Sequence, residues 1–268
     1  MNAAYGASAV ALLQVRNVVV RFGGVVALNG VSFDVGRQQI CGLIGPNGSG
    51  KTTLFNCISG IYRYSEGEIS FEGRKLDGTP RHKMIDIGLG RTFQNLALFR
   101  TLSVRENVLV GAHHLARTGI VRNALRLPPV RAEERIADEK LNRLLHLLDL
   151  QAVANVPVAA LPFGTQKRVE LARALISEPK LLLLDEPAGG LNHGEVDELG
   201  DLIRSIREQF RCSVLLVEHH MSLVMRVSEK VVALEFGQKI ADGTPEQVRN
   251  EPEVIRAYLG ETEHASAA

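Results

Sequence analysis

The chain has 268 residues, 45% of them hydrophobic and 23% charged, which suits one large globular domain with a substantial core. Lys and Arg number 31 against 30 Asp and Glu, and this near-neutral balance disfavours a dedicated nucleic-acid binder, which usually carries a basic excess. The three cysteines, Cys41, Cys57 and Cys212, are far apart, so the spacing argues against a disulfide framework or a zinc site and favours a reducing cytoplasm.

The two ends of the chain are expected to be flexible tails, at 1–12 and 263–268. The first segment has a short apolar stretch without a preceding basic residue, which does not fit a signal peptide. No run approaches the roughly 18 apolar residues of a membrane span. If the protein works at a membrane, another chain is expected to supply the span.

The first predicted elements are strands of an antiparallel region. Residues 12–24 and 25–35 are rich in Val and alternate apolar with polar side chains on either side of a glycine pair. Residues 38–45 form a more continuous apolar strand that leads into a glycine loop and a predicted helix at 51–61. Residues 67–76 predict a further strand pair.

The middle third of the chain has helical spacing. Apolar residues in 103–117 and 132–150 recur at the helical period, and a Pro-Pro break is expected between them. From 180 the pattern returns to apolar strands, at 180–187 and 212–220, with a helix at 193–210 between them. Such unbroken apolar runs are typical of parallel strands buried on both faces.

Residues 45–53 read GPNGSGKTT and fit the pattern G-x-x-x-x-G-K-[ST]. Glycines let backbone N–H groups curl towards phosphate oxygens. Lys51 then reaches the β- and γ-phosphates, and the Thr52 hydroxyl binds Mg²⁺. An apolar strand precedes the loop and a helix follows, which favours a phosphate loop over a chance glycine-rich turn. The ATP-binding residues expected here are Gly45, Pro46, Asn47, Gly48, Ser49, Gly50, Lys51, Thr52 and Thr53.

The strand at 180–187 ends in two acidic residues. Asp185 is placed to hold the Mg²⁺ shell, directly or through water. Glu186 follows, where a carboxylate could polarise an attacking water. The alternative is a pair of solvated acids, and the phosphate loop in the same chain favours the functional interpretation. A guanine-specific NKxD motif is absent, so ATP is favoured over GTP, and a nucleotide kinase remains an alternative.

Residues 161–175, LPFGTQKRVELARAL, followed by LLLLDEP, resemble the signature motif and Walker B strand of ABC-type ATPases. The resemblance spans about 13–260, and its motifs stand in the family's order. It implies a head-to-tail dimer in which the signature of one subunit caps the γ-phosphate held by the other. The usual family pattern is Leu-Ser-Gly-Gly-Gln, whereas this chain has Leu-Pro-Phe-Gly-Thr. The serine hydroxyl that normally touches the γ-phosphate is therefore missing, and an inactive signature is an alternative. The signature residues are Leu161, Pro162, Phe163, Gly164 and Thr165.

The resemblance assigns four other residues. Phe22 stands where the family stacks an aromatic ring on adenine, with a strand-core Phe as the alternative. Gln94 stands at the Q-loop, where the family's Gln reaches Mg²⁺ and the attacking water. His219 stands at the H-loop, where it would support Glu186. Asn192 stands in the D-loop, where many relatives carry Asp. Gln94 and His219 would otherwise be a surface Gln and a strand-end His.

Several segments resemble the ATP-binding subunits of bacterial branched-chain amino acid importers, among them 21–33, 88–108 and 243–261. This implies membrane-spanning permease subunits, a second homologous ATPase subunit and, indirectly, a periplasmic solute-binding protein, at the cytoplasmic face of the inner membrane. Importers of urea or short amides use similar subunits. An arginine-rich segment would face anionic lipid or the partner's loops, or be a solvated helical face. Its arginines are Arg117, Arg122, Arg126, Arg131 and Arg135.

The expected fold is an α/β P-loop NTPase with a RecA-like core, an antiparallel β subdomain and a helical insertion. The ABC ATPase domain is expected at 13–262, with the core and β subdomain at 13–94 and 176–262 and the helical subdomain at 95–175. The rival hypotheses are a soluble ABC ATPase of DNA repair or translation and a nucleotide-gated module that does not hydrolyse ATP.

Overall fold

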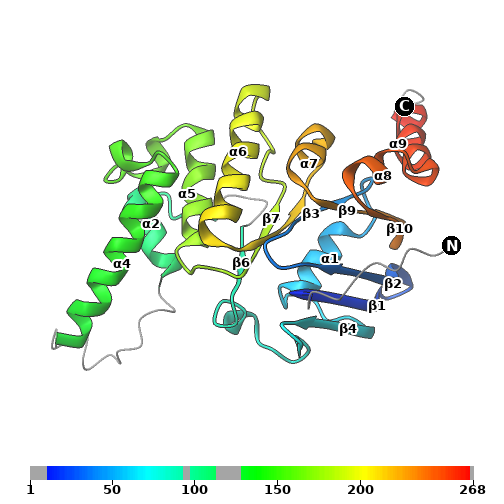
Figure 1. Cartoon of the computed structure of the whole chain (residues 1–268), viewed down its shortest axis with the longest axis horizontal. Helices are drawn as coiled ribbons and strands as arrows, with labels where there is room; N and C mark the ends of the chain where they lie inside the picture. The colour runs from blue at the N-terminus through cyan, green and yellow to red at the C-terminus, as the bar shows by residue number, and fades with distance from the viewer. Residues whose placement is uncertain (1–10, 93–96, 113–127, 266–268) are drawn as a thin grey trace.

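The structure is a computed structural model that describes residues 11–92, 97–112 and 128–265, with side chains in these ranges except at 128–134 and 259–265. Its strands form a four-stranded antiparallel sheet, β2-β1-β4-β5, and a six-stranded sheet, β10-β9-β3-β8-β7-β6 (Figure 1). The strands are β1 (Leu13–Phe22), β2 (Val25–Val35), β3 (Ile40–Ile44), β4 (Glu66–Phe71), β5 (Arg74–Lys75), β6 (Leu89–Arg91), β7 (Leu181–Asp185), β8 (Ser213–Val217), β9 (Lys230–Glu235) and β10 (Gln238–Gly243).

The six-stranded sheet is parallel except for β10, which pairs antiparallel with β9. Its central strands are buried on both faces, as their unbroken apolar runs predict. In β7, Leu182 and Leu184 belong to one core, whereas Leu181 and Leu183 belong to the other. The alternation follows from the two-residue period of a strand.

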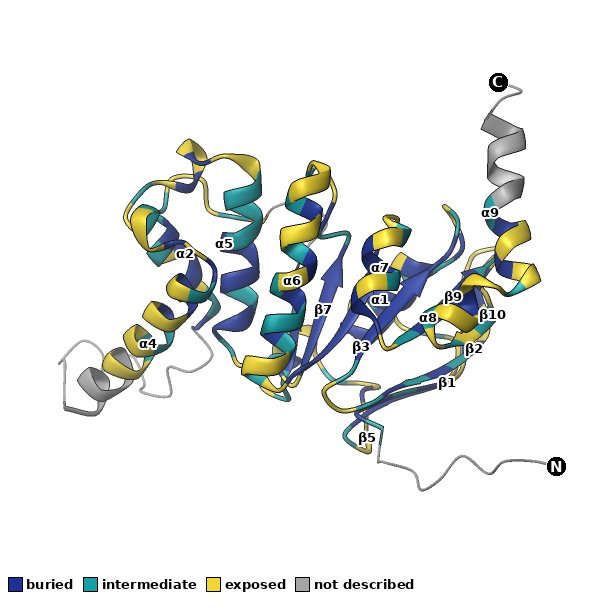
Figure 2. Ribbon diagram, turned by 45° about the horizontal axis from the view of Figure 1, so that its top comes forward, coloured by how far each residue is buried: buried dark blue, intermediate teal, exposed yellow. Residues whose placement is uncertain are grey.

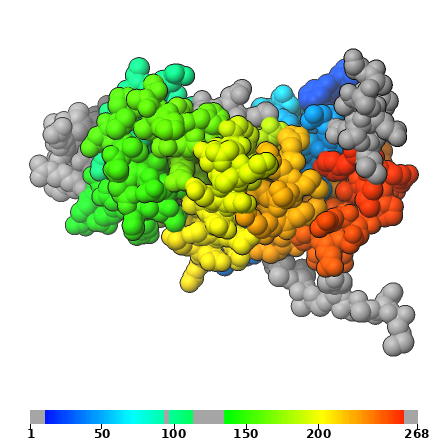
Figure 3. Space-filling model, turned by 90° about the horizontal axis from the view of Figure 1, so that it is seen from above, coloured from blue at the N-terminus to red at the C-terminus, as the bar shows by residue number. Residues whose placement is uncertain are grey.

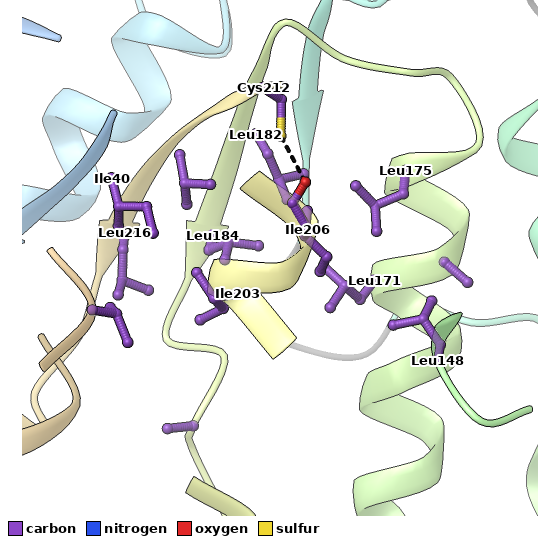
Figure 4. Packing of buried hydrophobic residues seen from close by; sticks show 14 of the residues in the cluster. Ile40, Leu148, Leu171, Leu175, Leu182, Leu184, Ile203, Ile206, Cys212 and Leu216 are labelled. Atoms are coloured by element: carbon purple, nitrogen blue, oxygen red, sulfur yellow. Dashed lines mark hydrogen bonds between the residues drawn. The ribbon is translucent and has the colours of Figure 1, made fainter. Parts of the chain in front are cut away.

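Helices on the two faces of this sheet close those two cores (Figure 2). On one face lie α6 (His193–Phe210), α7 (Met221–Val227) and α8 (Pro245–Arg249), and Figure 4 shows Ile203 and Ile206 of α6 packed towards β7. On the other face, α1 (Lys51–Ile58) fills the space between the two sheets. This is the α/β core with an antiparallel β subdomain that the sequence predicts.

A helical insertion lies at one end of the molecule, and α9 (Pro252–Ala265) lies at the other (Figure 3). The described α-helices of the insertion are α2 (Val104–Gly111), α4 (Pro128–Leu147) and α5 (Phe163–Leu175), all within the segment expected to be helical. The expected Pro-Pro break is the first turn of α4, where proline is tolerated because N–H groups there have no helical partner. None of the described helices is both long enough and apolar enough to cross a membrane.

Two expected boundaries differ from the structure. Leu12, placed in the N-terminal tail, is fully buried, and its N–H donates to the Val35 carbonyl at 2.8 Å. Helix α9 continues to Ala265, beyond the expected limit at 262. Leu12 therefore belongs to the folded core, and the last helix overlaps the expected C-terminal tail.

Candidate functional site

The candidate site lies at the carboxyl ends of three adjacent parallel strands. In the sheet β8 lies between β3 and β7, and Val217 of β8 pairs with Leu43 of β3 on one side and Asp185 of β7 on the other. Asp185 ends β7, and the loops that follow the three strands carry the phosphate motif, Glu186 and His219. Ligands of parallel α/β sheets bind at this edge, so the predicted residues are brought to one place by strand order.

The phosphate loop has a curled backbone that depends on glycine. Gly45 has φ 148°, and a Cβ there would lie 2.1 Å from the Leu234 carbonyl oxygen. Gly50 has φ 101° at the N-terminus of α1, and a Cβ there would lie 2.7 Å from the Leu28 side chain. The backbone is fixed from outside as well, because the Gly237 N–H donates to the Ser49 carbonyl at 3.0 Å.

Lys51 places a buried positive charge inside this loop. Its side chain is 5% exposed, and its ammonium donates to the carbonyls of Gly45 at 2.6 Å and Pro46 at 2.8 Å. It also lies 3.4 Å from the Ser49 hydroxyl. Of the neighbouring motif residues, Asn47, Gly48 and Thr52 are exposed and Thr53 is partly exposed.

Phe22 ends β1 as a half-exposed ring. It is 47% exposed, and it meets Tyr62 edge to face, with ring centroids 5.3 Å apart. The alternative of a strand-core phenylalanine therefore does not fit the structure. An exposed aromatic face suits stacking on a flat base.

Asp185 is buried at the end of β7 and is engaged by a residue that the sequence did not predict. The guanidinium of Arg91 donates to Asp185 Oδ2 at 2.9 Å, and the two side chains are 12% and 2% exposed. Arg91 also donates to Asn56 at 2.9 Å and Ser59 at 2.5 Å, both near the end of α1. Burial raises the pKa of Asp185, and Arg91 opposes that rise. The sequence signal that could have indicated Arg91 is its place as a basic residue three positions before Gln94.

Glu186 and His219 form a hydrogen-bonded pair. Nε2 of His219 lies 2.7 Å from Oε1 of Glu186, and both side chains are partly exposed. Glu186 has a left-handed backbone, with φ 48°, and its N–H donates to the Val217 carbonyl at 2.9 Å. A buried acid, Glu218, adjoins the pair and was also missed, although it is the only charged residue in the segment VLLVE.

The signature residues form the N-terminus of α5. Pro162 precedes the helix, and its carbonyl accepts the Gln166 N–H at 3.0 Å. The Gln166 side chain donates to the Leu161 carbonyl at 2.8 Å, so it stabilises the turn that precedes α5. Phe163 is 45% exposed. A Cβ on Gly164 would lie 2.9 Å from Glu195 Oε1, so a larger residue there would require the Glu195 side chain to shift.

Three other predictions have different outcomes. Asn192 caps α6, accepting from the Glu195 N–H at 3.0 Å, so its side chain has a role within the chain. Gln94 lies outside the described residues. Of the arginine-rich segment, Arg135 is exposed and lies 3.7 Å from Glu139. The other four arginine side chains, of Arg117, Arg122, Arg126 and Arg131, lie outside the described set.

The residues present fit a nucleotide phosphate group and a divalent cation. At Gly45 and Gly50 the loop has no room for a side chain, and it holds the Lys51 charge, which suits a polyphosphate. Oδ1 of Asp185 is buried and has no hydrogen-bond partner among the described residues, although Oδ2 is engaged by Arg91. One oxygen of a hard carboxylate is therefore available to a cation such as Mg²⁺.

Comparison with known proteins identifies the family. Residues 28–189 match the family described as ABC transporter, and residues 238–264 match the family described as branched-chain amino acid ATP-binding cassette transporter. The chain is 43% identical to the high-affinity branched-chain amino acid transport ATP-binding protein BraF of Pseudomonas aeruginosa and 42% identical to LivG of Escherichia coli. Each alignment covers 93% of this chain and 98% of the relative.

Solved structures agree with this match. A nucleotide-free ATP-binding cassette from an ABC transporter superposes with a TM-score of 0.79 at 29% identity, over 92% of this chain and 98% of that one. The ADP conformation of an ATP-binding cassette superposes with a TM-score of 0.79 at 28% identity, over 93% and 99%. The chain therefore belongs to the ABC transporter family, as an ATPase of the ATP-binding cassette type.

Proposed function

We propose that the chain is the ATP-hydrolysing subunit of a bacterial importer of branched-chain amino acids, Leu, Ile and Val. The hydrolytic role is supported by the Glu186–His219 pair, which adjoins a phosphate loop holding Lys51. The choice of solute is supported by two relatives that are branched-chain amino acid transport proteins. Their alignments with this chain cover nearly their whole length. Because these relatives act in transport, the match favours this role over DNA repair or translation.

ATP binding is assigned to three parts of the site. Phe22 offers its exposed ring to adenine, and residues 45–53 surround the phosphates with N–H groups and the Lys51 ammonium. Thr52, Asp185 and Gln94 are proposed to hold Mg²⁺, which when bound neutralises phosphate charge. Arg91 holds Asp185 in place from the side of α1.

Hydrolysis is assigned to Glu186 and His219. The Glu186 carboxylate would orient an attacking water and accept its proton, while His219 fixes that carboxylate through the 2.7 Å contact. The two side chains are partly exposed, so a nucleotide and water can reach them. Gln94 would complete the set from the Q-loop. Most of the rate then comes from positioning and charge neutralisation.

The signature residues, 161–165, would act on ATP bound by a homologous second ATPase subunit. Backbone N–H groups at the start of α5 and the positive end of its dipole suit a phosphate. The serine hydroxyl of the family pattern is missing, and Phe163 and Gly164 supply only backbone donors. Closure of the dimer on ATP and reopening after hydrolysis would then move the helical insertion.

The permease subunits would dock where the insertion meets the core. A cavity of about 350 Å³ lies there, between α2, α5 and the segment after α1. Half-exposed apolar side chains at its edge include Ile61, Phe99 and Val110, with Arg173 beside them. Such a site would hold the chain at the cytoplasmic face of the inner membrane. A periplasmic binding protein would act only through the permease, and no nucleic-acid partner is proposed.

The solute is tested by uptake in cells lacking the chromosomal copy. Cells complemented with the wild-type chain are expected to take up labelled leucine, with unlabelled isoleucine and valine competing and urea and acetamide not competing. Cells complemented at equal level with Lys51→Ala should not take up leucine. Uptake of labelled urea or acetamide instead of leucine would replace the proposed solute while keeping the ATPase role.

A further inference from the structure

Glu218 joins the two loops that carry the catalytic pair. The side chain is 1% exposed at the end of β8. Its Oε1 accepts the Ala188 N–H at 2.6 Å, and its Oε2 accepts the N–H groups of His219 at 3.0 Å and His220 at 3.3 Å. One carboxylate thus binds the loop after β7 through one oxygen and the loop after β8 through the other.

The loop after β7 has a conformation that needs support. Glu186 has φ 48°, in the left-handed region that disfavours a side chain of this size. Its own N–H is bound to the Val217 carbonyl, and its carbonyl accepts the Gly189 N–H at 3.1 Å. Ala188, two residues on, is bound to Glu218. A strained residue persists only where surrounding contacts determine its conformation, and Glu218 supplies one of these contacts.

The position of His219 depends on the same side chain. Glu218 directly precedes it and accepts its backbone N–H, so the start of the H-loop is bound to the carboxylate that also fixes the loop of Glu186. The 2.7 Å distance between His219 Nε2 and Glu186 Oε1 requires both backbones to be correctly placed. Rotation of either loop would separate the two side chains.

We propose that Glu218 is a positioning residue, which holds Glu186 and His219 together by binding both loops through its two oxygens. It does not touch the nucleotide, and it acts through the catalytic pair. The inference rests on the proposed hydrolytic roles of Glu186 and His219. A substitution at Glu218 is expected to lower turnover rather than ATP affinity. The reason is that the phosphate loop lies between β3 and α1, and Glu218 binds neither of them.

A second acid provides a matched control. Glu229 accepts the backbone N–H of Ile40 at 2.5 Å and lies 3.2 Å from Arg207. It therefore also binds a backbone amide of a neighbouring strand. Ile40 begins β3, whereas the candidate site lies beyond the other end of that strand. If Glu218 were only a structural cap, Glu218→Gln and Glu229→Gln would have comparable effects.

The experiment compares purified full-length variants by phosphate release, affinity for a fluorescent ATP analogue and thermal unfolding. The variants are Glu218→Gln, Glu218→Asp, Glu229→Gln and Glu186→Gln. Gln keeps one acceptor oxygen and replaces the other by an NH₂ group that cannot accept an N–H. Asp keeps the charge but is one carbon shorter, so it should not bind both loops. Both are conservative enough to fold even if larger truncations do not.

We expect both Glu218 variants to lower kcat by about tenfold to 100-fold with little change in nucleotide affinity, since a misplacement of about 1 Å has such effects. Glu229→Gln should keep the wild-type kcat. Wild-type turnover in Glu218→Asp, or a fall in kcat of Glu229→Gln equal to that of Glu218→Gln, would overturn the inference. If Glu186→Gln itself keeps normal turnover, the proposed hydrolytic role fails as well.

Discussion

His219 Nε2 lies 2.7 Å from Glu186 Oε1, although 33 positions separate the two residues in the chain. The contact follows from strand order, because β7 and β8 are parallel neighbours and Asp185 pairs with Val217 at their carboxyl ends. Glu186 stands one residue after Asp185, and His219 stands two residues after Val217. The register of the sheet thus brings the acid and the histidine together.

This pair predicts separate effects on turnover and binding. Glu186→Gln is expected to lower kcat by about 100-fold or more, because an amide cannot accept a proton from water. His219→Ala should also lower kcat, by leaving the Glu186 carboxylate without its 2.7 Å contact. Phosphate release and fluorescent-nucleotide binding check both variants. A fall in ATP affinity equal to the fall in kcat would mean that the pair acts mainly in binding.

The buried Arg91–Asp185 pair predicts a pH-dependent stability change. Arg91→Met should lower the free energy of unfolding by about 3 kcal/mol at about pH 7, because it leaves a buried carboxylate uncompensated. Burial already raises the pKa of Asp185, and loss of Arg91 should raise it further. A carboxyl with a raised folded-state pKa destabilises above its unfolded pKa, so the deficit should shrink as pH falls towards about 4.

Urea unfolding at about pH 7 and about pH 5 measures this deficit, and Asp185→Asn provides the control. Combined with Arg91→Met, the Asn substitution removes the buried charge and should restore part of the lost stability. An equal deficit at both pH values, with no recovery in the double variant, would contradict the account of the pair.

Two glycines of the phosphate loop should respond differently to alanine. Gly45→Ala places a Cβ 2.1 Å from the backbone oxygen of Leu234, which cannot move without shifting β9, so we expect a loss of at least about 3 kcal/mol. Gly48 has φ 77° and no atom within 4 Å of such a Cβ, so its loss should be about 1 kcal/mol. Urea unfolding measures the stability of both variants. Equal losses would mean that the cost comes from the positive φ alone and not from the contact with Leu234.

The three cysteines should be unreactive in the folded protein. Burial raises the pKa of Cys41 and Cys57 to about 12 and that of Cys212 to about 11. Since the thiolate is the reactive form, an aromatic disulfide reagent at about pH 8 should modify none of them rapidly. All three should react in concentrated guanidinium. Rapid modification of one thiol in the native protein would show that its environment opens.

The sequence was sufficient where the chemistry lies in one short segment. The phosphate loop, with Lys51, could be predicted because its residues are consecutive and stand between a strand and a helix. Asp185 and Glu186 could be predicted because an apolar run ends at them. The family resemblance added Phe22 and His219, and the structure places Phe22 at the surface and His219 beside Glu186.

The residues that hold the site together could not be predicted in this way. Arg91 pairs with Asp185 across 94 positions, and Glu218 binds Ala188 across 30. Each contact depends on which strands become neighbours, and β6, which ends in Arg91, has only three residues. A strand that short has no readable period. Its place in the sheet is set by its pairing with β7.

The most direct test measures leucine uptake in cells and ATP hydrolysis in inverted membrane vesicles prepared from the same strains. These strains would carry the wild-type chain, Glu186→Gln or Glu229→Gln at equal level. The account predicts that Glu186→Gln abolishes both activities while Glu229→Gln keeps both. Leucine uptake that persists in Glu186→Gln cells without ATP hydrolysis by this chain would contradict the claim that the Glu186–His219 pair powers import.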